Sequence, residues 1–150
     1  MDKWARHSEF IEFSDSPWHE LSIEISECRL ALITTGGVHL KSQPAFDMED
    51  PAGDPTFREI PADTRPSNLT ITHDYYDHSD ADKDINVVFP IERVHSLKRL
   101  GKIGEVNHRH FSFMGHLRHP NIRHLVANSV KRVVNHLRKD RVDIAILTPA

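Results

Sequence analysis

Four adjacent residues combine hydroxyl side chains with glycines in a way that suits the binding of an anion. They are Thr34, Thr35, Gly36 and Gly37. Glycines let a backbone come close to a ligand, and successive backbone N–H groups can hold a carboxylate or a phosphate. The segment has neither a dinucleotide-binding fingerprint nor the lysine of a P-loop. A tight turn after a buried strand explains the same residues, and their spacing does not decide between the two interpretations.

A second polar segment is rich in groups that bind metals or exchange protons. Its members are His73, Asp74, Asp77, His78, Asp80, Asp82 and Asp84. Imidazole and carboxylate groups can hold a divalent ion. The spacing, however, is neither that of a zincin helix nor that of an EF-hand loop. We therefore favour a solvated turn capped by aspartates, and we predict no metal site in this chain.

Histidine is unusually frequent, with twelve residues, and cysteine occurs once. Several histidines lie between positions 108 and 124, and a histidine there could act as an acid or a base near neutral pH. Surface histidines explain the same cluster, and no Ser-His-Asp or Cys-His pattern can be recognised. Cys28 opens an apolar run, which favours a buried and unreactive thiol over a nucleophile.

The segments that must position these groups are of two alternating kinds. Short apolar runs are typical of buried strands, and segments with helical periodicity are typical of helices. A run at 28–33, stopped by glycines, predicts a strand buried on both faces. Further strands are expected at 68–72, 111–114 and 142–147, and helices at 91–100 and 120–139.

Residues 41–70 interrupt this alternation. They contain five prolines and few periodic apolar positions, which predicts a long irregular loop. Apolar residues within the stretch indicate that it packs on something. They are Phe46, Met48, Phe57 and Ile60.

The whole pattern predicts one α/β domain over residues 1–150. We expect an open, mostly parallel sheet with flanking helices, Rossmann-like or flavodoxin-like, carrying the long loop as an insertion. Ligands of such folds bind outside the carboxyl ends of the strands. Three such ends, at 34–37, 113–115 and 148–150, should converge. We expect the chemistry there.

Composition excludes several classes of protein. With 19 basic and 22 acidic residues the net charge is −3, so no basic excess points to nucleic acid or to an anionic membrane. A single cysteine excludes an internal disulfide framework. No apolar run approaches the roughly 20 residues that span a bilayer. The amino-terminal residues lead into no apolar signal core, so we expect a cytoplasmic protein.

Four ordered blocks of sequence resemble a known family. They lie at 30–41, 46–58, 73–86 and 110–115, and the resemblance covers roughly residues 29–150. Together they are similar to the selenoprotein B subunits of the glycine, sarcosine, betaine and D-proline reductases. The run from Val38 to Lys41 is closer to the D-proline branch than to the glycine branch.

This resemblance implies reductive cleavage of a C–N bond in D-proline, glycine, sarcosine, betaine or a related amine. In the D-proline branch a selenolate attacks the α-carbon and breaks the ring C–N bond. A pyruvoyl group on a partner subunit activates the amine, and a thiol reductant resets the selenium. A selenol is mostly anionic at neutral pH, whereas a thiol with a pKa of about 8.5 is mostly protonated. The chain itself would carry no further cofactor.

The resemblance also implies roles for individual residues. Substrate contacts are expected at Thr34, Thr35, Gly36, Gly37, His39, Lys41 and Thr148. In that role Lys41 would supply charge to a carboxylate. Contacts to the pocket or to a partner are expected at His73, Asp74, Asp77, His78, Met114 and Gly115, with a structural role favoured for each.

The selenocysteine of the family is expected immediately after Ala150. We therefore expect a front part of a longer selenoprotein, read to a UGA codon and inactive alone, or else a natural short homologue. A sheet without its closing helix should favour oligomerisation. A different class of function is a non-catalytic α/β domain that binds a small molecule or a metal. A third is metal-dependent hydrolysis near His73 and Asp77.

Overall fold

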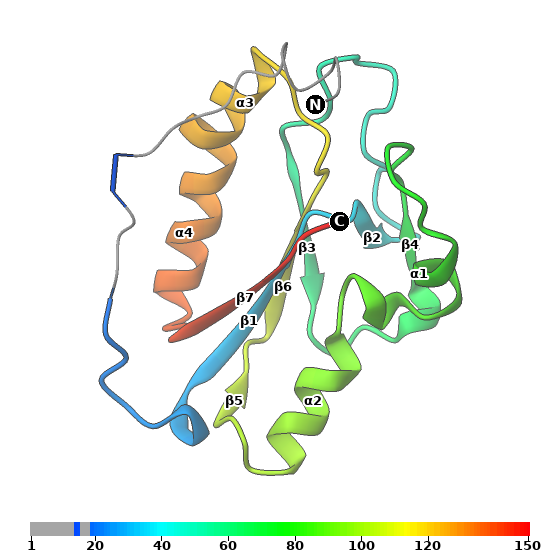
Figure 1. Cartoon of the computed structure of the whole chain (residues 1–150). Coiled ribbons are helices and arrows are strands. Elements are labelled where there is room, and N and C mark those ends of the chain that lie inside the picture. Colours follow the sequence, from blue (N-terminus) through cyan, green and yellow to red (C-terminus); the bar gives the residue numbers. More distant parts are fainter. Residues whose placement is uncertain (1–13, 16–18) are drawn as a thin grey trace.

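The computed structural model describes residues 14, 15 and 19–150, and it has an α/β fold built on one mixed sheet (Figure 1). The strand β1 lies inside this sheet and pairs in parallel with β5, β6 and β7, while β3 pairs antiparallel with β6. The strands are β1 (Arg29–Thr34), β3 (Phe57–Pro61), β5 (Glu105–Val106), β6 (Arg109–Phe113) and β7 (Ile144–Thr148). The prediction of an α/β fold is confirmed.

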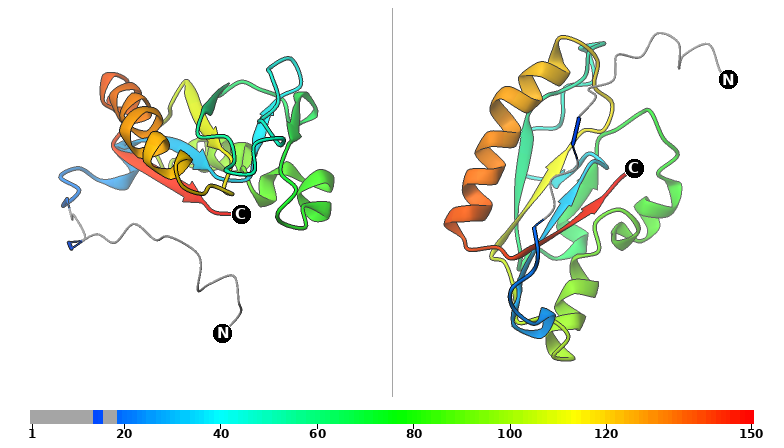
Figure 2. Two further views of the ribbon diagram at one scale, coloured as in Figure 1. Left: turned by 90° about the horizontal axis from the view of Figure 1, so that it is seen from above. Right: turned by 60° about the vertical axis from the view of Figure 1, so that its left-hand side comes forward.

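Helices cover the two faces of the sheet, as the turned views show (Figure 2). On one face lies α2 (Ile91–Arg99). On the other lies a continuous helical segment made of α3 (Asn121–His124), a π-helical stretch (Leu125–Ser129) and α4 (Val130–Lys139). A two-stranded sheet of β2 (Val38–Leu40) and β4 (Leu69–Ile71) and the short helix α1 (Ser79–Lys83) stand beside the main sheet. Short 3-10 helices are Ile25–Glu27, Pro66–Asn68 and Ile85–Val87.

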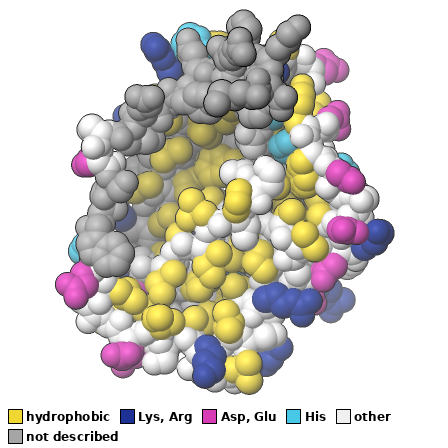
Figure 3. Space-filling view, in the orientation of Figure 1, with side chains coloured by type: hydrophobic (Ala, Val, Ile, Leu, Met, Phe, Trp, Pro, Cys, Tyr) yellow, Lys and Arg dark blue, Asp and Glu magenta, His cyan; other side chains and the backbone are white. Residues whose placement is uncertain are grey.

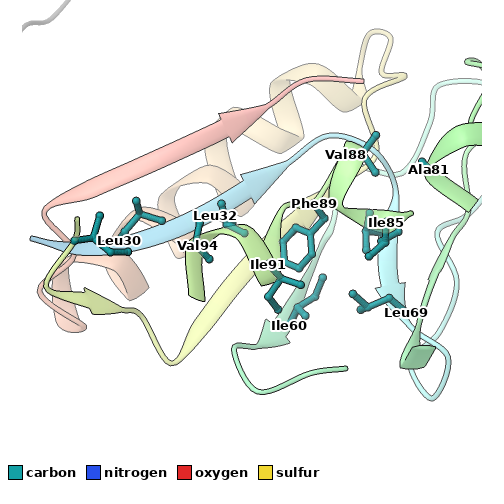
Figure 4. Packing of buried hydrophobic residues seen from close by; sticks show 12 residues of the cluster. Leu30, Leu32, Ile60, Leu69, Ala81, Ile85, Val88, Phe89, Ile91 and Val94 are labelled. Atoms are coloured by element: carbon teal, nitrogen blue, oxygen red, sulfur yellow. The ribbon is translucent and has the colours of Figure 1, made fainter. Parts of the chain in front are cut away.

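The larger part of the core lies between β1 and α2 (Figure 4). Leu30 and Leu32 point to this face because side chains alternate along a strand. They meet Ile91 and Val94, which stand three positions apart on one side of α2. Each such fully buried side chain contributes about 1.5–3 kcal/mol relative to an exposed one. A smaller cluster around Phe111 packs under α4 on the opposite face.

Periodicity predicted most of these elements correctly. The strands expected at 28–33, 68–72, 111–114 and 142–147 correspond to β1, β4, β6 and β7, and the helix expected at 91–100 corresponds to α2. The helix expected at 120–139 is present and contains the π-helical stretch. The pairing of β3 is antiparallel, so the sheet is mixed at that edge.

The prediction of an irregular loop over 41–70 was wrong in part. The stretch contains β3 and reaches the start of β4. Antiparallel pairing to β6 holds β3 in place. This pairing joins residues far apart in the sequence, so it produces no apolar periodicity within the proline-rich stretch itself. The apolar residues of the stretch do pack inward, since Phe46 and Ile60 are buried and Phe57 joins the cluster under α4.

Candidate functional site

The carboxyl ends of β1, β6 and β7 meet at one edge of the sheet, as the sequence predicted. Thr35 N donates to the carbonyl of Thr148 over 3.1 Å, which joins the ends of β1 and β7. Gly36 forms a β-bridge with Met114, which joins the ends of β1 and β6. Ala150 N donates to Thr35 Oγ1 over 3.1 Å. In Figure 1 the end marked C therefore lies against the loop that follows β1.

The backbone amides of this loop are not free to cradle an anion. Thr35 N donates to Thr148, Gly36 N donates to Thr34 Oγ1 over 3.0 Å, and Gly37 N donates to the carbonyl of Phe113 over 2.9 Å. Each N–H group thus has a partner within the fold. The anion cradle that the spacing left open at 34–37 is therefore not formed by these amides, which bond within the fold as in a tight turn.

Gly37 is required by the turn itself. Its φ is +68°, and a Cβ there would lie 2.4 Å from the carbonyl oxygen of Thr72. Gly37 in turn accepts a hydrogen bond from Thr72 N over 2.9 Å. A side chain would therefore meet both a strained backbone conformation and a neighbouring strand. This contact ties the end of β4 to the loop after β1.

Several of the predicted substrate contacts use their polar atoms inside the protein. His39 is buried, donates from Nδ1 to the carbonyl of Leu40 and accepts at Nε2 from the hydroxyl of Thr72. The hydroxyl of Thr148 donates to the carbonyl of Val88 over 2.7 Å. Lys41 is exposed beyond the end of β2. These side chains are not assembled around one point.

His73 lies against the loop after β1 and is only 3% exposed. Its Nδ1 accepts a hydrogen bond from Tyr75 N over 3.1 Å, so the proton of the neutral ring resides on Nε2. The ring stands edge-on to Tyr76 with centroids 4.8 Å apart. Burial, and after it the nearby His116, lowers the pKa of His73, while Asp74 opposes this. The imidazole is therefore neutral at pH 7.

The other predicted residues of this segment form a local turn. Asp77 Oδ1 accepts from Ser79 N over 3.0 Å, and this hydrogen bond lowers the pKa of the Asp77 carboxyl. His78 Nδ1 contacts Asp82 Oδ2 at 2.8 Å, one turn along α1. Asp74 is exposed. Within residues 14, 15 and 19–150, no group of three or more histidine, cysteine or acidic side chains is placed to hold a metal ion.

Two further residues lie at this edge. Tyr76 was not singled out from the sequence, whereas His116 is one of the histidines between positions 108 and 124. Tyr76 donates its hydroxyl to the carbonyl of Gly36 over 3.0 Å. His116 follows β6, and its ring stacks on Tyr75 with centroids 3.5 Å apart. Burial, and after it Arg118, lowers the pKa of His116. Tyr76 stands between Asp74 and Asp77, and that proximity to predicted site residues is the signal that could have identified it.

Cys28 is remote from this edge. It is fully buried just before β1 begins, so the six residues of β1 separate it from Thr35. At about 3.3 Å per residue this separation is roughly 20 Å. Burial, followed by the neighbouring carboxylates Asp143, Glu27 and Glu24, raises the pKa of the thiol. Cys28 is therefore protonated and shielded, as expected of an unreactive cysteine.

Comparison with known proteins decides the family. The family described as glycine/sarcosine/betaine reductase selenoprotein B matches residues 14–150. The chain belongs to this family. The resemblance that the sequence blocks indicated is thus confirmed. The family is one of oxidoreductases.

A curated relative agrees with the D-proline branch. D-proline reductase subunit gamma of Acetoanaerobium sticklandii is 36% identical over 98 residues, which is 65% of this chain and 39% of the relative. The chain thus spans about two fifths of the length of the curated relative that it matches. No solved structure matches the fold. Across the described part of the chain, every helix is too short or too polar to cross a membrane.

Proposed function

We propose that this chain forms the substrate-binding part of an amino-acid reductase subunit, and that the substrate is D-proline. The observation that carries the proposal is the convergence of β1, β6 and β7 at one edge, where His73 and Gly115 lie beside Thr35. Membership of the selenoprotein B family supports the reaction class, and the relative named D-proline reductase subunit gamma supports the substrate. Glycine, sarcosine and betaine are the competing substrates.

The proposed reaction opens the ring of D-proline by reduction. Two electrons and two protons break the bond between the α-carbon and the ring nitrogen, and the product is 5-aminopentanoate. The electrons come from a thiol reductant, and a pyruvoyl group on a partner subunit activates the amine. The residues of this chain bind and orient the amino acid at the sheet edge. Among the predicted substrate contacts, Thr35 lies beside Gly115 and Gly37 lies beside His73 in this arrangement.

The nucleophile must come from outside residues 1–150. The chain has no selenocysteine, and its one cysteine is buried at the far end of β1 with a raised pKa. A protonated and inaccessible thiol cannot attack a carbon atom. We therefore expect residues 1–150 alone to bind substrate without cleaving it, and we propose a selenocysteine as the missing group.

We also propose that another protein chain packs against the face of the sheet that carries α4. Ile144 and Ile146 point toward the α2 cluster, so alternation directs Ala145 and Leu147 to the opposite face. Leu147 is 68% exposed there. Figure 3, in the orientation of Figure 1, shows a broad hydrophobic area on the side of the molecule where β7 lies. Exposed apolar areas of this kind are typical of interfaces between subunits.

The shape of α4 supports this interface. The side of the helix that carries Arg132 and His136 contacts Phe57 of β3. Valines repeat every four residues on the opposite flank of the helical segment made of the π-helical stretch and α4. They are Val126, Val130 and Val134, and each is at least 37% exposed. The helix thus packs on the aromatic residues of β3 and β6 and leaves these valines exposed, as Leu147 of β7 is.

The experiment that tests the function isolates the protein with its partners, by an affinity tag at its amino terminus, from a host that inserts selenocysteine. The complex receives D-proline, glycine, sarcosine or betaine together with dithiothreitol. Cleavage releases 5-aminopentanoate, ammonia, methylamine or trimethylamine, so the product identifies the substrate. We expect 5-aminopentanoate and a copurified subunit that carries a pyruvoyl group. An intact complex that cleaves none of the four amino acids would refute the proposal.

A further inference from the structure

The strand β7 forms one edge of the main sheet, and some of its backbone groups point away from the protein (Figure 1). Thr35 N donates to the carbonyl of Thr148, so Thr148 directs its backbone groups toward β1. Because these groups alternate in direction along a strand, Ala145 and Leu147 direct theirs to the free side. Within residues 14, 15 and 19–150, the N–H and C=O groups of Ala145 and Leu147 have no hydrogen-bond partner.

The opposite edge of the sheet, β3, shows how this fold protects an edge. The strand carries the charged residues Arg58 and Glu59 and ends at Pro61, which has no N–H group. Gln43 Nε2 donates to the carbonyl of Glu59 over 2.8 Å and so occupies that acceptor. Charges, proline and covering groups are the usual means by which proteins keep the edge of one sheet from pairing with another.

The edge at β7 lacks this protection. Residues 144–148 contain no charged residue and no proline, and both Ala145 and Leu147 are exposed. The helix α4 packs on the aromatic residues of β3 and β6 and leaves Leu147 uncovered. An uncharged edge strand with free backbone groups is suited to hydrogen bonding with a further strand. The contrast with β3 indicates that this edge is built for pairing.

The side chains of β7 complement a second copy of the same strand. In an antiparallel pair of two copies about a two-fold axis at Ile146, Ala145 of each copy faces Leu147 of the other. The small side chain of Ala145 leaves room for the large side chain of Leu147. The two Leu147 side chains become diagonal neighbours on the face that carries α4, where long side chains reach each other.

The neighbouring residues favour this register over the adjacent ones. A shift of two residues in one direction places Pro149, which has no N–H group, opposite Ala145. A shift in the other direction places Asp143 opposite Leu147, and the N–H of Asp143 already donates to the carbonyl of Arg29. Only the register centred on Ile146 lets both outward residues of each copy use their donors and acceptors.

We propose that β7 pairs antiparallel with β7 of a second copy of this chain, about a two-fold axis at Ile146, and joins two sheets into one. Each pair of Ala145 with Leu147 of the other copy exchanges both of its backbone hydrogen bonds. The inference goes beyond the proposed reaction, because it involves neither substrate nor nucleophile. It also names the occupant of the interface proposed beside that reaction.

The first test is a disulfide that this register brings within reach. Facing residues of a pair without backbone hydrogen bonds have Cα atoms about 4.5 Å apart, which a disulfide can bridge. With oxidised glutathione as the oxidant, I146C should form a covalent dimer. L100C, at an exposed position beyond α2, is the control for random collision. I146C should link at least about tenfold faster, because pairing raises the effective concentration of the two thiols. The original chain should not link, since Cys28 is buried.

The second test measures the register by mixing variants. A145C and L147C face each other in the proposed pair, at about 5.5 Å between Cα atoms, so their mixture should yield a mixed disulfide. Either variant alone should yield far less covalent dimer. Its cysteines are then diagonal neighbours roughly 7–8 Å apart, which is beyond the reach of a disulfide.

The third test removes a backbone donor from the free edge. The N–H of Ala145 points away from β1, so A145P keeps the bonds between β1 and β7, and proline is tolerated at such an edge. We expect A145P to lose the dimer and to elute as a monomer in size-exclusion chromatography. A145S, which keeps the N–H group, should elute like the original chain. Urea unfolding checks that both variants are folded.

The outcomes separate this inference from the proposals above. A monomeric original chain, or I146C that links no faster than L100C, overturns the pairing of two β7 strands. An oligomer in which I146C stays unlinked means that the chains meet at the face and not at the edge, so only the edge pairing is refuted. Linkage of I146C to a different protein in the isolated complex identifies another occupant and also overturns it. Cleavage of D-proline by that complex is measured independently.

Discussion

The hydroxyl of Tyr76 donates to the carbonyl of Gly36 over 3.0 Å, and this hydrogen bond joins the segment after β4 to the loop after β1. The two residues are forty positions apart in the sequence. Burial, and after it Asp82, raises the pKa of Tyr76, so the hydroxyl remains a donor throughout the neutral range. The candidate site thus depends on a contact between two loops.

Replacement of Tyr76 by phenylalanine should loosen this connection. Y76F removes the donor and keeps the ring, so we expect the free energy of unfolding in urea to fall by about 1 kcal/mol. Y75F is the control, since Tyr75 is 53% exposed and its ring stack on His116 does not involve the hydroxyl. Equal effects of the two variants would contradict the role assigned to the Tyr76 hydroxyl.

The buried His110 should make stability depend on pH in mildly acidic solution. Its Nδ1 accepts from Leu32 N over 3.1 Å, and burial, followed by His95 and His108, lowers its pKa to about 4. An unfolded histidine has a pKa of about 6.5, so the unfolded chain binds the extra proton between pH 6.5 and 4. Stability is therefore fully present above pH 6.5 and falls as the pH drops toward 4.

Protonation linked to His110 should lower the free energy of unfolding by roughly 3 kcal/mol over that pH window, on the basis of about 1.4 kcal/mol per pKa unit. H110N keeps an acceptor for Leu32 N and removes the titrating ring, so its unfolding free energy should vary less between pH 7 and 4. Urea unfolding at several pH values measures this difference. H124N is the control, and a pH profile of H110N that parallels the original one would disprove the assignment.

The sequence predicted the elements whose side chains show a period. The apolar run before Thr34 is β1, and the stripe through Val133 and Leu137 is the face of α4 that packs on the sheet. The meeting of the strand ends at 34–37, 113–115 and 148–150 followed as well, because parallel strands bring their carboxyl ends to one edge. These features depend on local patterns and on one general rule of topology.

What could not be predicted depends on contacts between distant residues. The pairing of β3 with β6 is set by register and not by composition, so residues 41–70 suggested a loop. The sequence left open an anion site at the amides of 34–37, because two of their acceptors, the carbonyls of Thr148 and Phe113, lie far along the chain. The unused donor of His73 is a property of its surroundings, and the sequence could only mark His73 as a candidate.

The ion pair between Arg109 and Asp140 should protect the protein against acid. Arg109 Nε and Nη2 each lie 2.6 Å from a carboxylate oxygen of Asp140, and Asn107 adds a third donor. Hydrogen bonds from Arg109, which outweigh burial, lower the pKa of Asp140 to about 2. The ion pair therefore stabilises the fold fully above pH 3.8, the ordinary pKa of an aspartate, and this stabilisation is lost as the pH falls toward 2.

The variant D140N removes the charge that Arg109 contacts through two nitrogens, and Arg109 then keeps its longer contact with Glu59. We expect the unfolding free energy at pH 7 to fall by about 3 kcal/mol, as for other pairs of which one member is removed. The difference from the original chain should shrink below pH 4 and vanish near pH 2. D80N, which alters an exposed pair with Lys83, should change stability by less than about 1 kcal/mol. A constant difference for D140N down to pH 2 would argue against the ion pair.

The exposed Leu147 of β7 and the exposed valines of the helix predict association that a single charge should abolish. Leu147 stands on the face carrying α4, where a subunit interface would bury it. L147D places a carboxylate in that interface, and removing a charge from water without a partner costs several kcal/mol. We expect the original chain to elute as an oligomer in size-exclusion chromatography and L147D to elute as a monomer. Leu100 is a matched control, because it is 71% exposed just beyond the end of α2 and L100D should leave the oligomer intact. A monomer at all concentrations for the original chain, or an equal effect of L100D, would show that copies of this chain do not meet at β7.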